Sequence, residues 1–145
     1  MNGCRIVNIL LVEDDPGDVE LTREGFKEAK MLIRLHTVDD GVKAMNFLRK
    51  EPPYTDAVRP DLILLDLNLP RKNGQDVLHE IKSDENLKRT PVVVLTTSSA
   101  DMDILKCYDL GANCYISKPV RFEDFIRVVR SIENFWLTVV RTPPK

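Results

Sequence analysis

The chain has 145 residues, of which 43% are hydrophobic and 30% charged, and its formal net charge at pH 7 is −2. This length fits one domain with one sizeable core, and the near-neutral charge does not indicate nucleic acid or an anionic membrane surface as a partner. The first residues lack the pattern of a signal peptide, and no apolar run reaches membrane-spanning length, so a cytoplasmic location is expected.

Short apolar runs alternate with helical patterns in the first half of the chain. Residues 8–12 predict a strand that ends on the acidic segment 13–15, and a helical pattern follows from Asp18 to about Lys30. Residues 32–38 alternate loosely between apolar and polar side chains, which predicts a strand at an edge of the sheet. Apolar residues spaced by threes then predict a short helix over residues 42–48.

The centre of the chain carries a near-continuous apolar run. Residues 51–60 contain three prolines and no periodicity, which predicts a surface loop. The run 61–65 predicts a buried parallel strand that ends on Asp66. A helix is expected to begin at Gly74 and to end around residues 83–86.

The next part of the chain repeats the alternation. Residues 92–96 predict the most buried strand of all, and a helix over about residues 100–110 is expected to end at Gly111. Residues 114–117 predict a final short strand, which runs into Lys118-Pro119.

The last predicted helix, over residues 122–140, has apolar side chains on more than one face. A helix on a sheet needs a single apolar stripe, so the excess predicts apolar surface for a partner. A wide stripe on a well-buried helix explains the part before Ile132 equally well, whereas we favour an interface for the part from Phe135. The apolar residues are Phe122, Phe125, Ile126, Val129, Ile132, Phe135, Trp136, Val139 and Val140.

Five strands alternating with five helices predict an α/β fold with a parallel sheet and helices on both faces. The carboxyl ends of such strands lie at one edge of the sheet, where ligands bind. Three strands end on Glu13-Asp14, Asp66 and Thr96, and the fifth ends at Lys118. We therefore expect these side chains to meet.

Carboxylates brought together repel one another unless a cation lies among them. Glu13, Asp14 and Asp66 offer hard oxygen ligands of the kind that Mg²⁺ prefers. With the metal bound, Asp66 can stay ionised and attack phosphorus. Lys118 would then contact the phosphoryl oxygens, and the Thr96 hydroxyl could donate a further hydrogen bond.

Each of these residues alone is a weak signal. An Asp after a strand is usually a helix cap or a turn former, a Thr at a strand end is usually structural, and Lys-Pro is usually a turn. Asp15 in particular, followed by Pro16, is better explained as a helix cap than as a metal ligand.

Four segments together resemble the receiver domain of two-component response regulators, the CheY-like family, over residues 6–135. They read LVEDD at 11–15, DLNLP at 66–70, LTT at 95–97 and YISKP at 115–119, in the order and spacing of the family. The resemblance implies a flavodoxin-like (βα)5 three-layer sandwich with a five-stranded parallel sheet in the order 2-1-3-4-5. We expect one receiver domain over residues 6–140, between the terminal segments 1–5 and 141–145.

The resemblance also implies roles for residues of the site. Asp66 would be the phosphoacceptor for a histidine kinase, and Lys118 would contact the phosphoryl group. Glu13 and Asp14 would hold Mg²⁺ together with Asp66 and the backbone carbonyl of Asn68.

Two further residues match the switch pair of the family, Thr96 and Tyr115, and a cis peptide bond is implied before Pro119. Such a domain is a phosphoacceptor switch that catalyses only its own phosphorylation and dephosphorylation.

Shorter stretches resemble the single-domain regulators associated with bacterial phytochromes. They are DLNLPRKNG from Asp66, VVLTTS, NCY from Asn113 and the FWL segment at Phe135. This implies a stand-alone regulator with a phytochrome-like kinase partner and no DNA-binding part. Its signal would leave through a protein-binding surface, and we expect a homodimer through the last helix.

Three other classes are less consistent with the sequence. Phosphatases of the haloacid-dehalogenase type need a general acid two residues after the nucleophile, where this chain has Asn68. A flavodoxin-type binding module needs a phosphate loop rich in Gly, Ser and Thr where this chain has Glu13-Asp14-Asp15. A receiver that has lost phosphorylation would not retain the acidic, Asp, Thr and Lys positions.

Overall fold

The computed structural model describes residues 6–27, 29 and 32–144. A five-stranded parallel sheet has the strand order β2-β1-β3-β4-β5, which confirms the predicted fold. The weakly patterned strand, β2, lies at an edge as expected. The strands are β1 (Ile6–Val12), β2 (Leu32–Val38), β3 (Leu62–Leu65), β4 (Val92–Thr96) and β5 (Cys114–Ser117).

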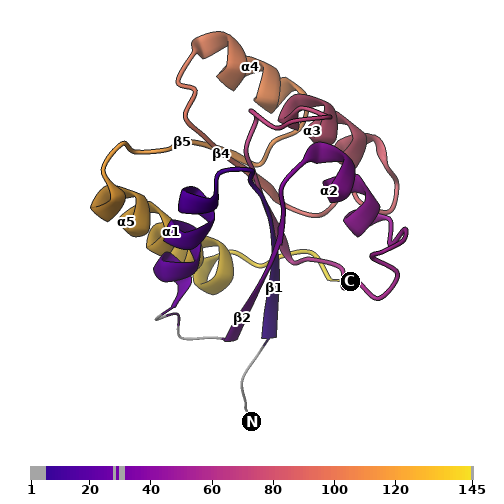
Figure 1. The fold of residues 1–145 in the computed structure, drawn as a ribbon, viewed down its shortest axis with the longest axis horizontal. Coiled ribbons are helices and arrows are strands. Elements are labelled where there is room, and N and C mark those ends of the chain that lie inside the picture. The colour runs from indigo at the N-terminus through magenta and orange to yellow at the C-terminus, as the bar shows by residue number, and fades with distance from the viewer. Residues whose placement is uncertain (1–5, 28, 30–31, 145) are drawn as a thin grey trace.

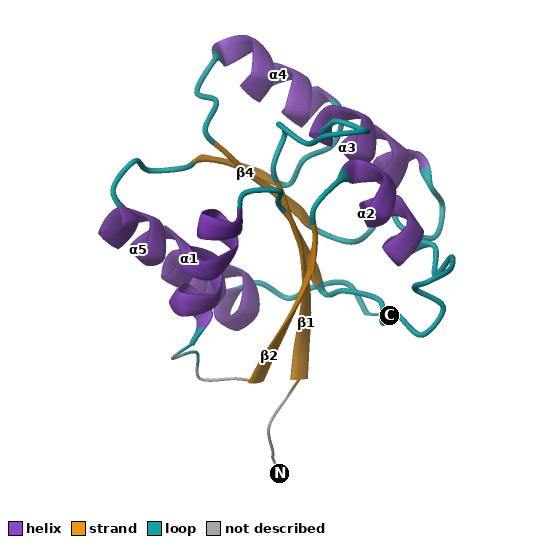
Figure 2. Cartoon of the chain, in the orientation of Figure 1, coloured by secondary structure: helices purple, strands orange, loops and turns teal. Residues whose placement is uncertain are grey.

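Helices cover both faces of the sheet (Figures 1 and 2). One face packs against α1 (Pro16–Phe26), α5 (Phe122–Ile132) and η1 (Glu133–Val139). The other face packs against α2 (Gly41–Leu48), α3 (Gly74–Ser83) and α4 (Asp101–Asp109). The described part of the chain has no helix long and apolar enough to cross a membrane.

Successive side chains of the central strands point to opposite faces of the sheet, so the core has two halves. Ile9 and Leu11 of β1 pack toward α1 and α5, whereas Leu10 and Val12 pack toward α2 and α3. Successive side chains of a strand point to opposite faces, so a strand covered on both faces needs an apolar residue at every position. The run in β3 meets this requirement, because all four of its side chains are buried.

Polar residues set the ends of several helices. The Asp15 carboxylate accepts hydrogen bonds from the backbone N–H groups of Gly17 and Asp18, at 2.8 and 3.4 Å, which confirms Asp15 as the cap of α1. The helix ends at Phe26, earlier than predicted, and residues 28 and 30–31 lie outside the described part of the chain. Gly111 follows α4 with a φ of 103°, a conformation that favours glycine.

The last predicted helix is not uniform. It is α-helical as far as Ile132 and then widens into the π-helix η1, where the N–H of Val140 donates to the carbonyl of Phe135 at 2.8 Å. A π-turn holds more residues than an α-turn, so the positions that follow face different directions from those in the predicted helix. Leu137 is buried against the sheet, whereas Phe135 is 53% exposed, so the core takes up part of the apolar excess.

The carboxyl-terminal segment lies against the amino-terminal edge of the sheet. Pro143 and Pro144 line a small hollow of about 20 Å³ with Pro60 and Pro91, which precede β3 and β4. Pro143 and Pro144 therefore lie beside the residues that precede β3 and β4, although both prolines are exposed.

Candidate functional site

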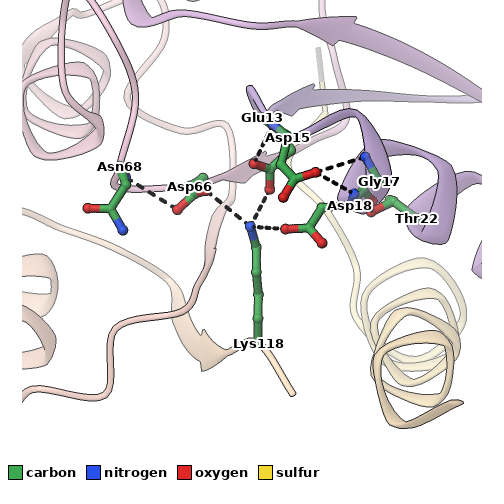
Figure 3. Close-up of polar contacts among 8 residues, drawn as sticks. All are labelled: Glu13, Asp15, Gly17, Asp18, Thr22, Asp66, Asn68 and Lys118. Atoms are coloured by element: carbon green, nitrogen blue, oxygen red, sulfur yellow. Dashed lines mark hydrogen bonds and ion pairs between the residues drawn. The ribbon is translucent and has the colours of Figure 1, made fainter. Parts of the chain in front are cut away.

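Of the side chains predicted to converge, Figure 3 shows Glu13, Asp66 and Lys118 together at the carboxyl edge of the sheet. Glu13 follows β1, Asp66 follows β3, Thr96 ends β4 and Lys118 follows β5. All four are buried, with at most 9% of the residue exposed. The strand ends thus bring together residues that are far apart in the sequence.

Three carboxylates form a group that could hold a metal ion. Glu13, Asp14 and Asp66 each offer an oxygen, and these oxygens lie within 4.8 Å of one another. Glu13 and Asp66 are buried, whereas Asp14 is exposed. Hard oxygen donors with one open side fit a small divalent cation that keeps some of its waters. The backbone N–H of Asn68 donates to Asp66 Oδ1 at 3.3 Å, so this peptide unit lies beside the cluster.

The Lys118 ammonium lies among three carboxylates. It contacts Glu13 Oε1, Asp18 Oδ2 at 2.8 Å and Asp66 Oδ2 at 3.0 Å, and only 3% of its side chain is exposed. Asp18 was not among the site residues predicted from the sequence. Acidic residues are common in the first turn of a helix, so its type and position gave no signal.

Burial and charge pull the pKa values of these groups in different directions. Burial raises the pKa of Glu13 to about 7, although the Lys118 ammonium opposes this shift. Burial also acts to raise the pKa of Asp66, but the Thr96 hydroxyl and Lys118 outweigh it, and the pKa lies below its ordinary value. Burial acts to lower the pKa of Lys118, and hydrogen bonds to Asp18 and Glu13 raise it instead. Asp66 is therefore ionised at neutral pH and Lys118 is charged.

Thr96 Oγ1 is buried and has no partner with hydrogen-bond geometry among the described residues. It lies near enough to Asp66 to favour the charged carboxylate. A buried hydroxyl without a partner is uncommon in a folded protein. Thr96 can therefore donate to an acceptor that arrives at Asp66.

Tyr115 is half-buried beneath the loop that follows β4. Its hydroxyl donates to the backbone carbonyl of Ser98 at 3.0 Å, and its backbone N–H donates to the Tyr108 hydroxyl at 3.2 Å. Ser98 Oγ in turn donates to Asp103 Oδ2 at 2.5 Å. Tyr115 is thus bonded to the loop through its ring hydroxyl and to α4 through its backbone.

Two hollows open beside the acidic cluster. The larger, of about 390 Å³, is lined in part by Glu13, Asp14 and Lys43. The smaller, of about 190 Å³, is lined by Leu67, Asn68, Asn73, Gln75 and Asp103. The larger hollow gives Glu13 and Asp14 access to solvent, whereas the smaller one lies beside Asn68.

One implied feature differs in the structure. In the described part of the chain the cis peptide bond lies between Pro52 and Pro53, and the Lys118-Pro119 bond is not cis. The expectation of a cis bond before Pro119 was therefore wrong.

The sheet order, the acidic cluster and the buried lysine define a class of protein. Residues 9–130 match the family model described as the response regulator receiver domain. The chain belongs to this family, whose members are phosphoacceptor switches rather than enzymes. This confirms the resemblance seen in the sequence.

Two relatives, Rcp1 and RcpA, are similar over nearly the whole chain. The response regulator Rcp1 of Synechocystis sp. is 47% identical over 93% of this chain and 92% of its own length. A crystal structure of the phosphorylated cyanobacterial phytochrome response regulator RcpA is 48% identical, with a TM-score of 0.94 over 97% of this chain and 100% of that one. The Mn²⁺-bound form of Rcp1 gives 46% identity and a TM-score of 0.92 over 95% of this chain and 99% of that one.

Proposed function

We propose that the chain accepts a phosphoryl group on Asp66 from a histidine kinase. An Asp66 oxygen attacks phosphorus as the bond from phosphorus to the kinase imidazole breaks, and the imidazole nitrogen keeps the electron pair of that bond. The observation that carries this proposal is the position of Asp66, an ionised and buried carboxylate that contacts Lys118 at 3.0 Å beside two further acids. An ionised oxygen is the nucleophile that this chemistry needs.

Mg²⁺ is the proposed cofactor. Glu13, Asp14, Asp66 and the backbone carbonyl of Asn68 would hold it, and it would supply positive charge near the phosphoryl oxygens. The choice of Mg²⁺ is supported by the oxygen donors of Glu13, Asp14 and Asp66, which lie close enough together to share one ion. Lys118 holds a second positive charge at the same carboxylate.

The signal would pass through Thr96 and Tyr115. We expect the Thr96 hydroxyl to bond a phosphoryl oxygen, which would draw the loop after β4 toward Asp66. This loop carries Ser98, whose carbonyl accepts the Tyr115 hydroxyl. A shift of the loop would therefore reach β5 and α4.

The proposed partners are a histidine kinase and a second copy of this chain. The similarity to the phytochrome response regulator RcpA favours a phytochrome-like kinase, and the proposed location is the cytoplasm. The homodimer would use the end of the last helix, where an apolar hollow of about 250 Å³ is lined by residues of β5, α5 and η1, including Phe135 and Trp136. Residues 6–140 would form the receiver domain in each copy.

The test is incubation with Mg²⁺ and acetyl phosphate, followed by intact mass measurement. We expect a gain of one phosphoryl group, which hydroxylamine removes and chelation of the metal prevents. Asp66→Asn should abolish the gain, whereas Asp61→Asn, at the opposite end of the same strand, should retain it. A normal gain in the Asp66→Asn protein would show that another residue is the nucleophile.

A further inference from the structure

The Lys118 ammonium has three N–H groups and three carboxylate neighbours. They are Glu13, Asp18 and Asp66, which approach it from three different elements (Figure 3). An ammonium group has no further donors, so a new acceptor must replace one of these partners. A phosphoryl group on Asp66 would be such an acceptor.

Asp18 differs from the other two carboxylates in where it lies. It belongs to the first turn of α1, its side chain is 22% exposed, and it is not part of the group that could hold a metal. Its backbone is fixed by the helix, because its N–H donates to Asp15 and its carbonyl accepts the Thr22 hydroxyl at 2.8 Å. The helix thus holds the carboxylate at the outer side of the ammonium.

The Asp18 carboxylate has two effects on an incoming phosphoryl group, and both make its binding at Lys118 less favourable. It occupies one donor of Lys118, and its negative charge repels the phosphoryl oxygens. The same carboxylate favours the binding of a divalent cation, because a nearby negative charge attracts the cation.

We propose that Asp18 is a positioning residue that competes with the phosphoryl group for the Lys118 ammonium and so slows phosphorylation of Asp66. The inference rests on the proposed role of Asp66 and adds a regulator of its rate. Because Asp18 lies on α1 and Lys118 directly follows β5, the contact also ties the start of α1 to the sheet edge.

The test compares Asp18→Asn with Glu24→Gln, which removes the same charge from an exposed site on the same helix. At saturating Mg²⁺, Asp18→Asn should gain the phosphoryl group from acetyl phosphate about fivefold faster, the change expected from a partly exposed ion pair. Calorimetry should show Mg²⁺ binding about threefold weaker, as expected for one lost nearby charge. Glu24→Gln should match the wild type in both measurements, and Asp18→Glu should restore much of the wild-type behaviour.

Opposite changes in the two measurements separate this role from a structural one, because a loosened fold would slow phosphorylation and weaken Mg²⁺ binding together. A folded Asp18→Asn protein that is phosphorylated at an unchanged or lower rate overturns the proposal. Thermal denaturation establishes that the variant is folded.

A second measurement needs neither metal nor phosphate. In the metal-free protein, the ¹H–¹⁵N signal of the Lys118 ammonium should be protected from solvent exchange, and Asp18→Asn should reduce this protection. An unchanged signal overturns the inferred contact. A wild-type chain that gains no phosphoryl group overturns the function of Asp66 and the competition with it, whereas an unchanged rate in Asp18→Asn overturns the competition alone.

Discussion

Glu13 is both a buried carboxyl group and a proposed metal ligand. Its carboxyl group contacts the Lys118 ammonium and lies near Asp66, and burial raises its pKa to about 7. A proton and a divalent cation would therefore compete for the same oxygen near neutral pH. This competition gives the site a pH dependence that an exposed carboxylate would not have.

Mg²⁺ affinity should therefore depend on pH. Below about pH 7 the cation must displace the proton of Glu13, so affinity should fall about tenfold for each pH unit, and above pH 7 it should level off. The folded pKa lies above the ordinary value of 4.5, so the stability that Glu13 contributes in the metal-free chain is present below pH 4.5 and is lost as the pH rises through 7. Calorimetric titrations at pH 6 and pH 8 measure the affinity, and equal affinities would contradict the prediction.

The neighbouring acids Asp14 and Asp15 should respond differently to neutralisation. Asp14→Asn removes a member of the acidic cluster, and we expect Mg²⁺ affinity to fall at least about tenfold. Asp15→Asn removes a charge one residue away but keeps a good helix cap, so affinity should change by less than about twofold. Equal losses in the two variants would mean that overall charge, rather than ligation, controls cation binding.

Glu13, Asp14, Asp66 and Lys118 were predictable from the sequence because each follows a strand, and parallel strands end at one edge. Asp18 was not predictable. Its role depends on the path of the Lys118 side chain across the sheet edge, and neither helical periodicity nor spacing contains that information.

At the scale of elements, the start of α3 packs directly against the backbone of Asp66. A Cβ atom on Gly74 would lie 2.2 Å from the Asp66 carbonyl oxygen and 2.6 Å from Leu67 Cα. The Gly74 N–H also donates to the Leu67 carbonyl at 2.9 Å. The loop after β3 therefore closes tightly only because this position has no side chain.

Gly74→Ala should disturb both the fold and the site. We expect the free energy of unfolding to fall by about 1–3 kcal/mol, since backbone atoms must move to admit the methyl group, and phosphorylation by acetyl phosphate to slow. Gly17→Ala is the control, because its Cβ would meet only the Asp15 side chain, at 3.2 Å. Urea denaturation measures stability, and a Gly74→Ala protein as stable and as reactive as the control would contradict the close packing.

The central strands β1, β3 and β4 could be predicted from the sequence to within about two residues, because strands buried on both faces are continuous apolar runs between turn residues. The change from α-helix to π-helix at Glu133 could not be predicted from the sequence. An apolar segment such as residues 135–140 fits either helical geometry, and the choice depends on which side chains the sheet and β5 can accommodate.

At the scale of the molecule, α1 links the site to the last helix. A Cβ atom on Gly25 would lie 2.5 Å from Val129 Cγ1, so α1 and α5 are in close contact. The same α1 carries Asp18 at its start, and α5 continues into η1 with Phe135. A change in the contact between Lys118 and Asp18 could therefore reach the proposed dimer surface through the packed helices α1 and α5.

Phe135→Ser should weaken the homodimer without unfolding the chain. The Phe135 ring is 53% exposed and packs edge-on against Trp136, with 5.8 Å between ring centroids, so its loss should cost little stability in the monomer but remove apolar area from the interface. Sedimentation with and without beryllofluoride and Mg²⁺ measures association, and we expect the phosphoryl mimic to change it in the wild type. Val58→Ser, in the loop between α2 and β3, should associate as the wild type does. A wild-type chain that stays monomeric at high concentration in both states would eliminate the dimer, and the apolar end of the last helix would then have to contact a different protein.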